Sequence, residues 1–444
     1  MSTHLLQPFN AAKPALRAWS WVFNVSALPL SWLRLLRARL LPSVAMALAL
    51  AGCGGGGGDA PVTNLPAPSQ EFSGRGPNIF ALFPNPLLDP TSCADLQVLV
   101  SCRLQTNEEA YAVAYYAAID PNGHKTTLAD WKSKNGFDNG ATNLGPLGQV
   151  EATLGDARDL GFGRRMTGRQ NANGTIAFYV ENYNVDVGAG YGDIQLNVEA
   201  AARQDPHWFL GANAIEWSPG PGGTVSFAKF YTFDPITGVR INMVNLDARG
   251  EKAMPGLCVQ CHGGRGDPLT PTGLFARTEN TVASLANQSL RGDVAAKLQP
   301  FKVDEFKFFD GVVNGVDYSG AGQEAKFKAF NQMVLCTYPK PSSDTSSDFT
   351  GSAPCTRPAA GLHDWQGKLA ELIKEAYGGD GMPNPSYIDT FVPNSWTLAG
   401  KESLYNNVVK LYCTTCHAVR GSAHQSDIDF LDYTAFAQYA PYIK

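Results

Sequence analysis

The chain has 444 residues, with 35 Lys and Arg against 40 Asp and Glu, and a formal net charge of −5 at pH 7. This acidic balance argues against a nucleic-acid-binding protein, because neutralising a phosphate backbone requires a basic surface. The length is large for a single domain, and a hydrophobic share of 44% is sufficient for buried cores.

The first 52 residues have the features of an export signal. They contain no acidic residue, carry five Lys or Arg, and end in a mostly apolar run from 40 to 50 followed by Ala51-Gly52-Cys53. Such a run is too short to span a bilayer well, although a buried helix or a permanent membrane anchor is the alternative. Leu50-Ala51-Gly52-Cys53 resembles the bacterial lipoprotein box. This resemblance implies that residues 1–52 are a signal peptide and that Cys53 carries a lipid anchor.

Residues 53–78 are rich in Gly and Pro and predict a flexible tether rather than a folded element. Gly54 after the lipidated cysteine resembles the sorting pattern for the outer membrane, which implies an exported protein facing the periplasm or the cell exterior. Five of the 35 basic residues lie in the leader, so the rest of the chain has 30 basic and 40 acidic residues. This excess of acidic residues suits a basic partner protein, but a soluble protein often has an acidic surface without any such partner.

Residues 79–250 predict a mixed α/β domain. Helices are expected at 108–119 and 127–134, the first capped by Thr106 or Asn107. From about Gly161 to Leu246 the pattern changes to β-branched and aromatic runs, with strands at 175–180 and 225–233. A five-residue loop at 234–238 predicts a hairpin with the segment 239–243. We therefore expect an antiparallel sheet that ends shortly before residue 258.

The pentapeptide Cys-x-x-Cys-His occurs twice, at 258–262 and at 413–417. This spacing is the attachment signature of c-type haem, in which both thiols bind the porphyrin and the adjacent His binds iron. A redox dithiol or a zinc site is the alternative. The motifs predict two covalently bound haem c groups with iron ligands His262 and His417. The predicted cofactor-binding residues are Cys258, Cys261, His262, Cys413, Cys416 and His417.

Residues 251–345 form the predicted first haem-binding region, with a helix at 323–336, and residues 346–444 form the second. A helix at 364–377 is predicted to bury a stripe of apolar residues: Trp365, Leu369, Leu372, Ile373 and Ala376. A second amphipathic helix at 402–412, with Leu404, Val408 and Leu411 on one face, leads into Cys413. This arrangement resembles a class I cytochrome c domain, which implies a mainly α-helical cytochrome c-like haem domain.

The sixth iron ligands stay open. A class I domain supplies a Met beyond the motif, yet none of the 27 residues after His417 is Met. We therefore expect a truncated C-terminus or an upstream ligand such as Met382, with His424 too close in sequence. For the first haem the candidates are Met243, Met254, Met333, His207 and His363. The hairpin before Cys258 resembles the sheet-based haem family around cytochrome c′-beta, which implies a haem with one open face.

Four of the nine cysteines remain after the lipid and haem positions are set aside: Cys93, Cys102, Cys336 and Cys355. Short loop closure favours the pairs Cys93–Cys102 and Cys336–Cys355, and an oxidising periplasm would preserve them. Buried thiols are the alternative.

The whole chain resembles a group of bacterial lipoprotein dihaem c-type cytochromes, through its two motifs and segments such as Phe162-Gly163-Arg164-Arg165-Met166. The predicted fold is α+β: a mixed helical and antiparallel-sheet N-terminal region followed by a mainly α-helical cytochrome c-like haem domain. The predicted function is electron transfer with redox partner proteins. A dihaem peroxidase or oxidase, or a gas-binding haem protein with one open iron, is the alternative. No catalytic residue is assigned.

A third possibility is a binding module, in which the N-terminal region docks a partner and haem is only a relay. Four aromatic residues are candidates for that surface, although core packing is their more common role. They are Tyr111, Tyr115, Tyr116 and Trp131.

Overall fold

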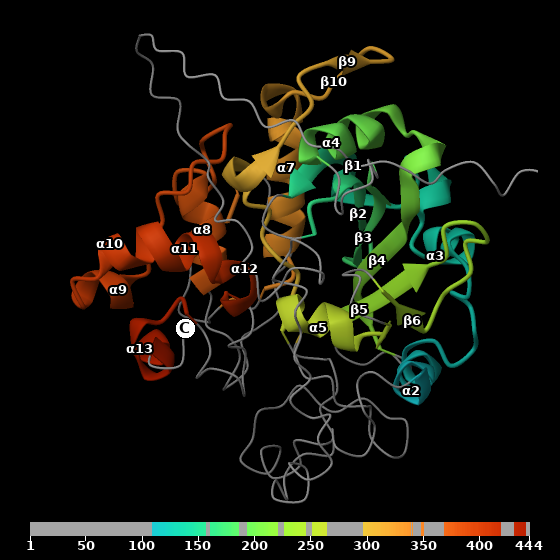
Figure 1. The fold of residues 1–444 in the computed structure, drawn as a ribbon, viewed down its shortest axis with the longest axis horizontal. Coiled ribbons are helices and arrows are strands. Elements are labelled where there is room, and N and C mark those ends of the chain that lie inside the picture. The colour runs from blue at the N-terminus through green and yellow to red at the C-terminus, as the bar shows by residue number, and fades with distance from the viewer. Residues whose placement is uncertain are drawn as a thin grey trace, which may run out of the picture. The chain divides into compact units, whose positions relative to one another are not determined.

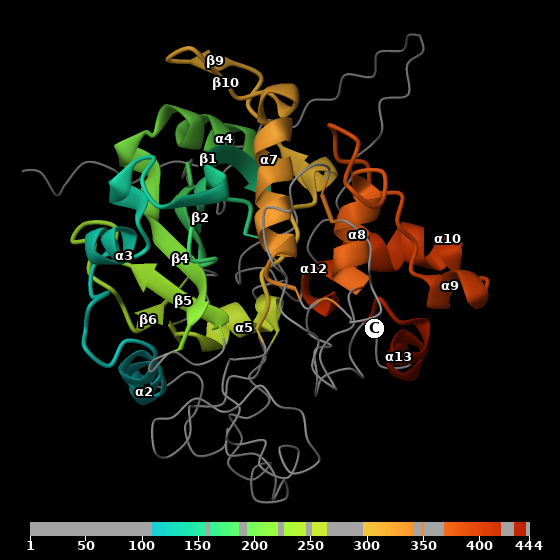
Figure 2. The same cartoon turned by 180° about the vertical axis from the view of Figure 1, so that it is seen from behind.

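The structure is a computed structural model of the chain (Figures 1 and 2). It describes residues 109–156, 160–185, 193–220, 226–245, 251–263, 296–338, 340, 348–349, 368–418 and 430–440. All of these belong to one compact unit, residues 65–444. The predicted signal peptide, the tether and Cys53 lie outside the described residues. Within the described part of the chain, no helix is both long and apolar enough to cross a membrane.

A six-stranded antiparallel sheet forms the centre of the N-terminal half, so the prediction of a mixed α/β fold with an antiparallel sheet is confirmed. The strand order is β5-β4-β3-β2-β1-β8. The bounds are β1 (Leu144–Asp156), β2 (Gly163–Asn171), β3 (Ile176–Tyr183), β4 (Phe209–Pro219), β5 (Ser226–Phe233) and β8 (Phe306–Lys307). The short β8 pairs with the end of β1, so the sheet also includes residues that follow the first Cys-x-x-Cys-His motif.

The remaining elements are mainly helices. They are α2 (Glu109–Ile119), α3 (Leu128–Lys134), α4 (Ile194–Arg203), α5 (Gly256–His262), α7 (Gly320–Leu335), α8 (Lys368–Ala376), α9 (Asn394–Leu398), α10 (Glu402–Leu404), α11 (Lys410–Tyr412), α12 (Thr414–His417) and α13 (Tyr433–Tyr439). A π-helical segment, η10 (Tyr405–Val409), joins α10 to α11. There are short 3-10 turns at η5 (Phe137–Asn139), η6 (Pro206–Trp208) and η9 (Val303–Glu305). Two small two-stranded sheets pair β6 (Met243–Val244) with β7 (Lys252–Ala253), and β9 (Val312–Val313) with β10 (Val316–Asp317).

The two faces of the sheet are covered by different helices, because successive side chains along a strand point in opposite directions. On one face, Phe178 packs edge-on against Phe330 of α7, with ring centroids 5.3 Å apart. On the other face, the neighbouring Tyr179 packs against Trp131 of α3 at 6.4 Å. The helix at 127–134 was predicted, whereas its cap was not: the Thr127 side chain accepts a hydrogen bond from the Asp130 amide. The aromatic residues Tyr115, Tyr116 and Trp131 are buried in the core.

Helix α4 was not predicted, since the sequence between 161 and 246 was interpreted as strands. It begins at Asp193, whose side chain accepts a hydrogen bond from the Gln195 amide. Two glycines paired across β1 and β2, Gly155 and Gly163, let this helix approach the sheet closely. A Cβ atom on Gly163 would lie 1.7 Å from the Asn197 carbonyl oxygen, so no other residue fits there without displacing α4.

The predicted hairpin after β5 forms only in part. The loop closes as expected, because the Asp234 amide donates to the Val239 carbonyl at 2.8 Å. The second strand, however, is reduced to isolated bridges: Arg240 pairs with Phe233, and Val239 pairs with Thr127 before α3. The chain then leaves β5, and β6 pairs with β7 instead. Strand β7 ends at Ala253, so this second pairing places the backbone three residues before the start of α5 at Gly256.

In the C-terminal half, the predicted stripe of α8 is confirmed for its described members. Leu369, Leu372, Ile373 and Ala376 are all buried, and Trp365 lies outside the described residues. The helix ends at Gly378 and Gly379, which have φ values of +89° and +94°. The helix at 402–412 differs from the prediction: Leu404 and Val408 are 37% and 42% exposed.

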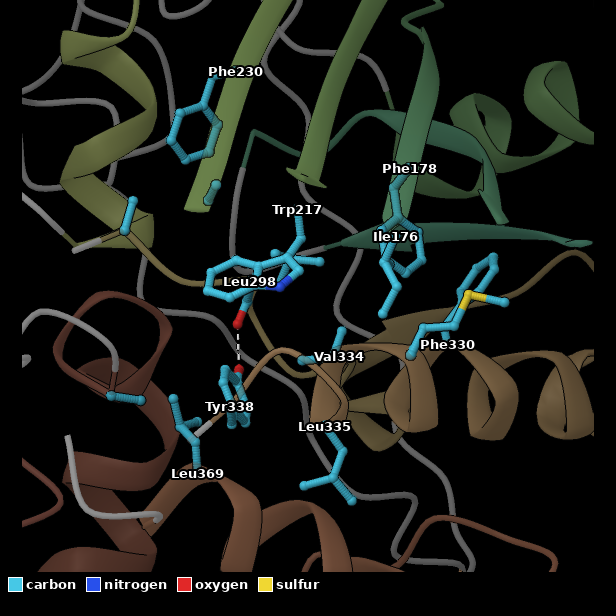
Figure 3. Packing of buried hydrophobic residues seen from close by; sticks show 14 of the residues in the cluster. Ile176, Phe178, Trp217, Phe230, Leu298, Phe330, Val334, Leu335, Tyr338 and Leu369 are labelled. Atoms are coloured by element: carbon cyan, nitrogen blue, oxygen red, sulfur yellow. Dashed lines mark hydrogen bonds between the residues drawn. The ribbon is translucent and has the colours of Figure 1, made fainter. Parts of the chain in front are cut away.

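One continuous hydrophobic core joins the sheet to the C-terminal helices. Figure 3 shows Ile176 and Phe178 of the sheet on the side of Val334 at the end of α7, and Leu369 of α8 close to Tyr338. The Tyr338 hydroxyl, just after α7, donates a hydrogen bond to the Leu298 carbonyl. Cys336, which caps α7, is disulfide-bonded. Cys355, its predicted partner, lies outside the described residues, as do Cys93 and Cys102.

Candidate functional site

The first Cys-x-x-Cys-His motif occupies the short helix α5. Pro255 starts the helix and Gly263, with φ +71°, ends it immediately after His262. In a helix this short, Cys258 and His262 are four residues apart and lie on the same side. Both residues, and Cys261, are half-buried rather than enclosed in the core.

The His262 side chain is held by a backbone carbonyl. Its Nδ1 atom lies 2.8 Å from the Lys297 carbonyl oxygen, and the Lys297 amide donates to the His262 carbonyl at 2.8 Å. Because a carbonyl oxygen only accepts, this contact places the ring proton on Nδ1 and leaves the lone pair on Nε2. A histidine fixed in this tautomer by a carbonyl is the form in which metal-binding histidines are usually found.

The surrounding contacts hold the rest of α5 in place. The Gln299 side chain donates to the Cys261 carbonyl, and the Phe230 ring of β5 lies 5.1 Å from the His262 ring. Cys258 Sγ lies 4.0 Å from Met254 Sδ, which also accepts a hydrogen bond from the Thr232 hydroxyl at 3.3 Å. Met254 is therefore beside Cys258, on the same side as the cysteine of the first motif.

A cavity of about 290 Å³ lies between α5 and the sheet. This volume is near the lower end of the range for cofactor sites, which is roughly 300–1,000 Å³. Cys258, Cys261 and His262 form part of its wall. The sheet supplies most of the opposite wall through apolar residues on β1 to β5 and the loop before β2: Leu154, Leu160, Phe162, Met166, Phe178, Val180, Ile215 and Phe230.

Charged groups are restricted to a few positions in the cavity wall. Arg164, at the start of β2, lies with Asp156, at the end of β1, at an N–O distance of 4.0 Å. Lys302 and Glu305 lie on the segment that leads to β8, with Nζ and Oε1 3.7 Å apart. The cavity is thus a mainly apolar space with two ion pairs in its wall.

The second motif lies in α12, which begins directly after Cys413. The His417 ring stacks on the Phe430 ring, with centroids 3.9 Å apart and planes within 8°. The Phe430 amide donates to the His417 carbonyl at 3.1 Å. Phe430 in turn contacts Phe436 and accepts a hydrogen bond from the Trp396 indole at 3.1 Å. The Cys416 side chain lies outside the described part of the structure.

The structure brings the two motifs together, although they are far apart in the sequence. Helices α5 and α12 pack against each other, and they lie side by side in both views (Figures 1 and 2). The Lys302 ammonium group, from the cavity wall beside the first motif, donates a hydrogen bond to the Thr414 hydroxyl inside the second. This proximity was not predicted, since no local pattern encodes it.

The candidate sixth ligands are in different places. Met333 and Met382 are fully buried in the core, Met243 is half-buried in β6, and His207 is exposed on η6. His363 and His424 lie outside the described residues. Met166 lines the cavity and was missed as a candidate. The two-residue spacing of Phe162, Arg164 and Met166, from the residue before β2 into the strand, is the signal that would have found it.

Within the described residues, no group of three or more His, Cys, Asp or Glu side chains could hold a metal ion. A haem iron does not need such a group, because the porphyrin supplies four nitrogen ligands and the protein adds one or two. The residues around His262 fit that requirement: a fixed imidazole and two adjacent thiols on the wall of an apolar cavity. No family model, no curated protein and no solved structure matches this chain.

Proposed function

We propose that this protein is a dihaem c-type cytochrome that transfers electrons. The observation that carries the proposal is the packing of α5 against α12, which puts two Cys-x-x-Cys-His motifs next to each other. Two functionally independent metal or thiol sites do not require their helices to be in contact. Two redox groups benefit from such contact, because electron transfer between them is favoured by a short separation.

The residues of this chain have definable roles in such a protein. Cys258 with Cys261, and Cys413 with Cys416, would form the thioether links, and His262 and His417 would bind the two irons. Haem, when bound, accepts and releases one electron at a time. The Lys297 carbonyl orients His262 and increases the basicity of its Nε2 atom. Phe430 fixes the plane of the His417 ring. The apolar wall formed by the sheet would limit the contact of a haem at the first site with water.

The helical part of the chain, from α8 to α13, would be the cytochrome c-like haem domain. Lipidation at Cys53 would hold the protein on a bacterial membrane, with the outer membrane preferred, facing the periplasm or the cell exterior. Soluble redox partner proteins would then deliver and receive electrons. The acidic balance that remains after the leader is removed supports a basic partner.

Mass spectrometry of the exported protein, made in a host that matures c-type cytochromes, tests the proposal first. We expect the added mass of two haem groups. The second measurement is the rate at which the reduced protein passes electrons to a small periplasmic cytochrome. Absence of both haem groups, or slow transfer combined with turnover of a small substrate, would contradict electron transfer as the function.

The cavity beside His262 supports a second candidate, a ligand-binding or peroxidase-like first haem. The sheet wall opposite His262 is largely apolar, which suits a small neutral ligand if Met166 does not bind the iron. Resonance Raman spectra and carbon monoxide binding to the reduced protein distinguish the two. A five-coordinate, high-spin iron that binds carbon monoxide supports this candidate, and two low-spin irons that do not bind it support transfer alone.

A further inference from the structure

The segment 297–302 connects the two motifs. At its start, Lys297 exchanges two contacts with His262, and Gln299 donates to the Cys261 carbonyl. At its end, Lys302 donates to the Thr414 hydroxyl, between the two cysteines of the second motif. Five residues of extended chain span at most about 17 Å, so the segment joins neighbouring sites.

Lys302 is a buried cation. Its side chain is 7% exposed, and its ammonium group is held by Thr414 and by the Glu305 carboxylate 3.7 Å away. Thr414 is itself 1% exposed, and its hydroxyl donates to the Lys410 carbonyl at 2.8 Å. Burying a charge is costly unless it is paired and hydrogen-bonded. The contacts with Thr414 and Glu305 therefore offset the cost of burying the Lys302 ammonium group. Glu305 is half-buried and also lines the cavity of the first motif.

The geometry points to Lys302 and Glu305 as the charge pair that sets the reduction potentials of both haem groups, an inference that rests on the proposed dihaem function. A reduced haem carries one more electron than an oxidised one. A nearby positive charge therefore favours the reduced form, and a negative charge favours the oxidised form. In a buried environment such charges act strongly, because water does not screen them.

The two charges have opposite effects on the reduction potentials, so the contribution of each residue can be measured with a single substitution. Lys302→Met leaves Glu305 without this cation and is expected to lower both potentials. Glu305→Gln leaves the Lys302 charge less balanced and is expected to raise both. Each substitution is expected to change the equilibrium constant between oxidised and reduced haem about tenfold. For a one-electron couple this corresponds to a shift of about 59 mV in the reduction potential. The larger shift from Lys302→Met is expected at the second haem, because the ammonium group touches Thr414.

The experiment is a spectroelectrochemical titration of the haem-loaded, full-length variants, with thermal unfolding as a second readout. Lys302→Arg keeps the charge and is expected to keep both potentials. The double variant is expected to return towards wild type, as in a double-mutant cycle. The matched control is Lys374→Met, which removes a similarly buried lysine, 8% exposed and paired with Asp380 at 2.7 Å, that does not line the cavity.

Haem content is measured before each titration, which separates this inference from the proposed function. If the wild-type protein holds no haem, the proposed function fails. If all variants hold two haem groups but Lys302→Met and Glu305→Gln shift the potentials in the same direction or not at all, the charge-pair inference is overturned. It is also overturned if Lys374→Met shifts the potentials as much as Lys302→Met.

Discussion

The two Cys-x-x-Cys-His motifs share a sequence pattern but have different surroundings. The first lies against a β-sheet, beside an apolar cavity, and its histidine is held by a backbone carbonyl. The second lies among short helices, and its histidine stacks on a phenylalanine that belongs to an aromatic cluster. One pentapeptide can thus be placed on two kinds of scaffold.

The difference matters because the surroundings of a ligand tune the group it holds. A carbonyl that accepts from Nδ1 makes the imidazole a stronger donor to iron, whereas a stacked ring mainly restricts its orientation. The sheet side also offers a cavity, and the helical side offers a tightly packed aromatic cluster. If both sites hold haem, we expect the first to be the more adaptable and the second to depend more on packing.

The largest expected effect comes from removing the thiols of one site at a time. Cys258→Ala/Cys261→Ala is expected to lose the haem at the first site and keep the other, and Cys413→Ala/Cys416→Ala is expected to do the reverse. Each variant should therefore show the added mass of one haem in mass spectrometry. Retention of both covalent groups in either double variant would rule out the assignment of that motif.

Trp396→Ala tests the packing of the second site. Trp396 is fully buried, contacts the rings of Tyr405 and Phe436, and donates to the Phe430 carbonyl. Truncating a buried Trp typically costs about 3–5 kcal/mol of unfolding free energy. We expect that loss in urea denaturation, together with a disturbed spectrum of the second haem. Leu398→Ala, in the same helix but 80% exposed, is the control and should change stability little.

Both Cys-x-x-Cys-His motifs were visible in the sequence because the pattern is local, and its residues need only a single helical turn. The strands at 175–180 and 225–233 were predictable for the same reason. The packing of α5 against α12, the Lys302–Thr414 contact and the cavity were not predictable, because they depend on residues that meet only in the folded chain.

The helix before the second motif shows how local geometry can alter a pattern. Regular helical spacing puts Leu404, Val408 and Leu411 on one face, but the fully buried residues are Tyr405 and Val409. The segment from Tyr405 to Val409 is π-helical rather than α-helical, so the pattern of a regular α-helix does not apply across it. The two buried residues are still four positions apart, but each lies one residue after the position that the sequence pattern predicted.

Glu216→Gln tests the sheet that supports the first site. Glu216 is fully buried on the face covered by α3, where it binds Lys125 at 2.6 Å and Asn135 at 2.9 Å. Burial alone would raise the pKa of Glu216, but the charges of Lys125 and Lys229 outweigh it and hold the pKa below its ordinary value. Removing one partner of a buried charge pair costs about 3 kcal/mol or more, which urea denaturation at pH 7 would detect.

The same substitution has a defined pH dependence. Because the folded pKa of Glu216 is depressed, its carboxylate contributes stability above the unfolded pKa of about 4.3, and this contribution is lost as the pH falls through the folded value. The difference between wild type and Glu216→Gln should therefore be largest at neutral pH and shrink in strong acid. A difference that grows on acidification would contradict the ion-pair assignment. Glu375→Gln, at an exposed glutamate of α8, is the control.

Phe430→Leu is expected to have the smallest effect on stability and the most local effect on the second site. Leucine keeps most of the apolar volume but removes the ring that stacks on His417, a contact worth about 1 kcal/mol. The first haem should be unchanged, while the paramagnetic resonance spectrum of the second should broaden as its imidazole plane becomes less fixed. Phe436→Leu removes a ring from the same cluster without touching His417 directly, and it serves as the matched control. If both variants broaden the second spectrum equally, the cluster as a whole, rather than the stack on His417, orients that ligand.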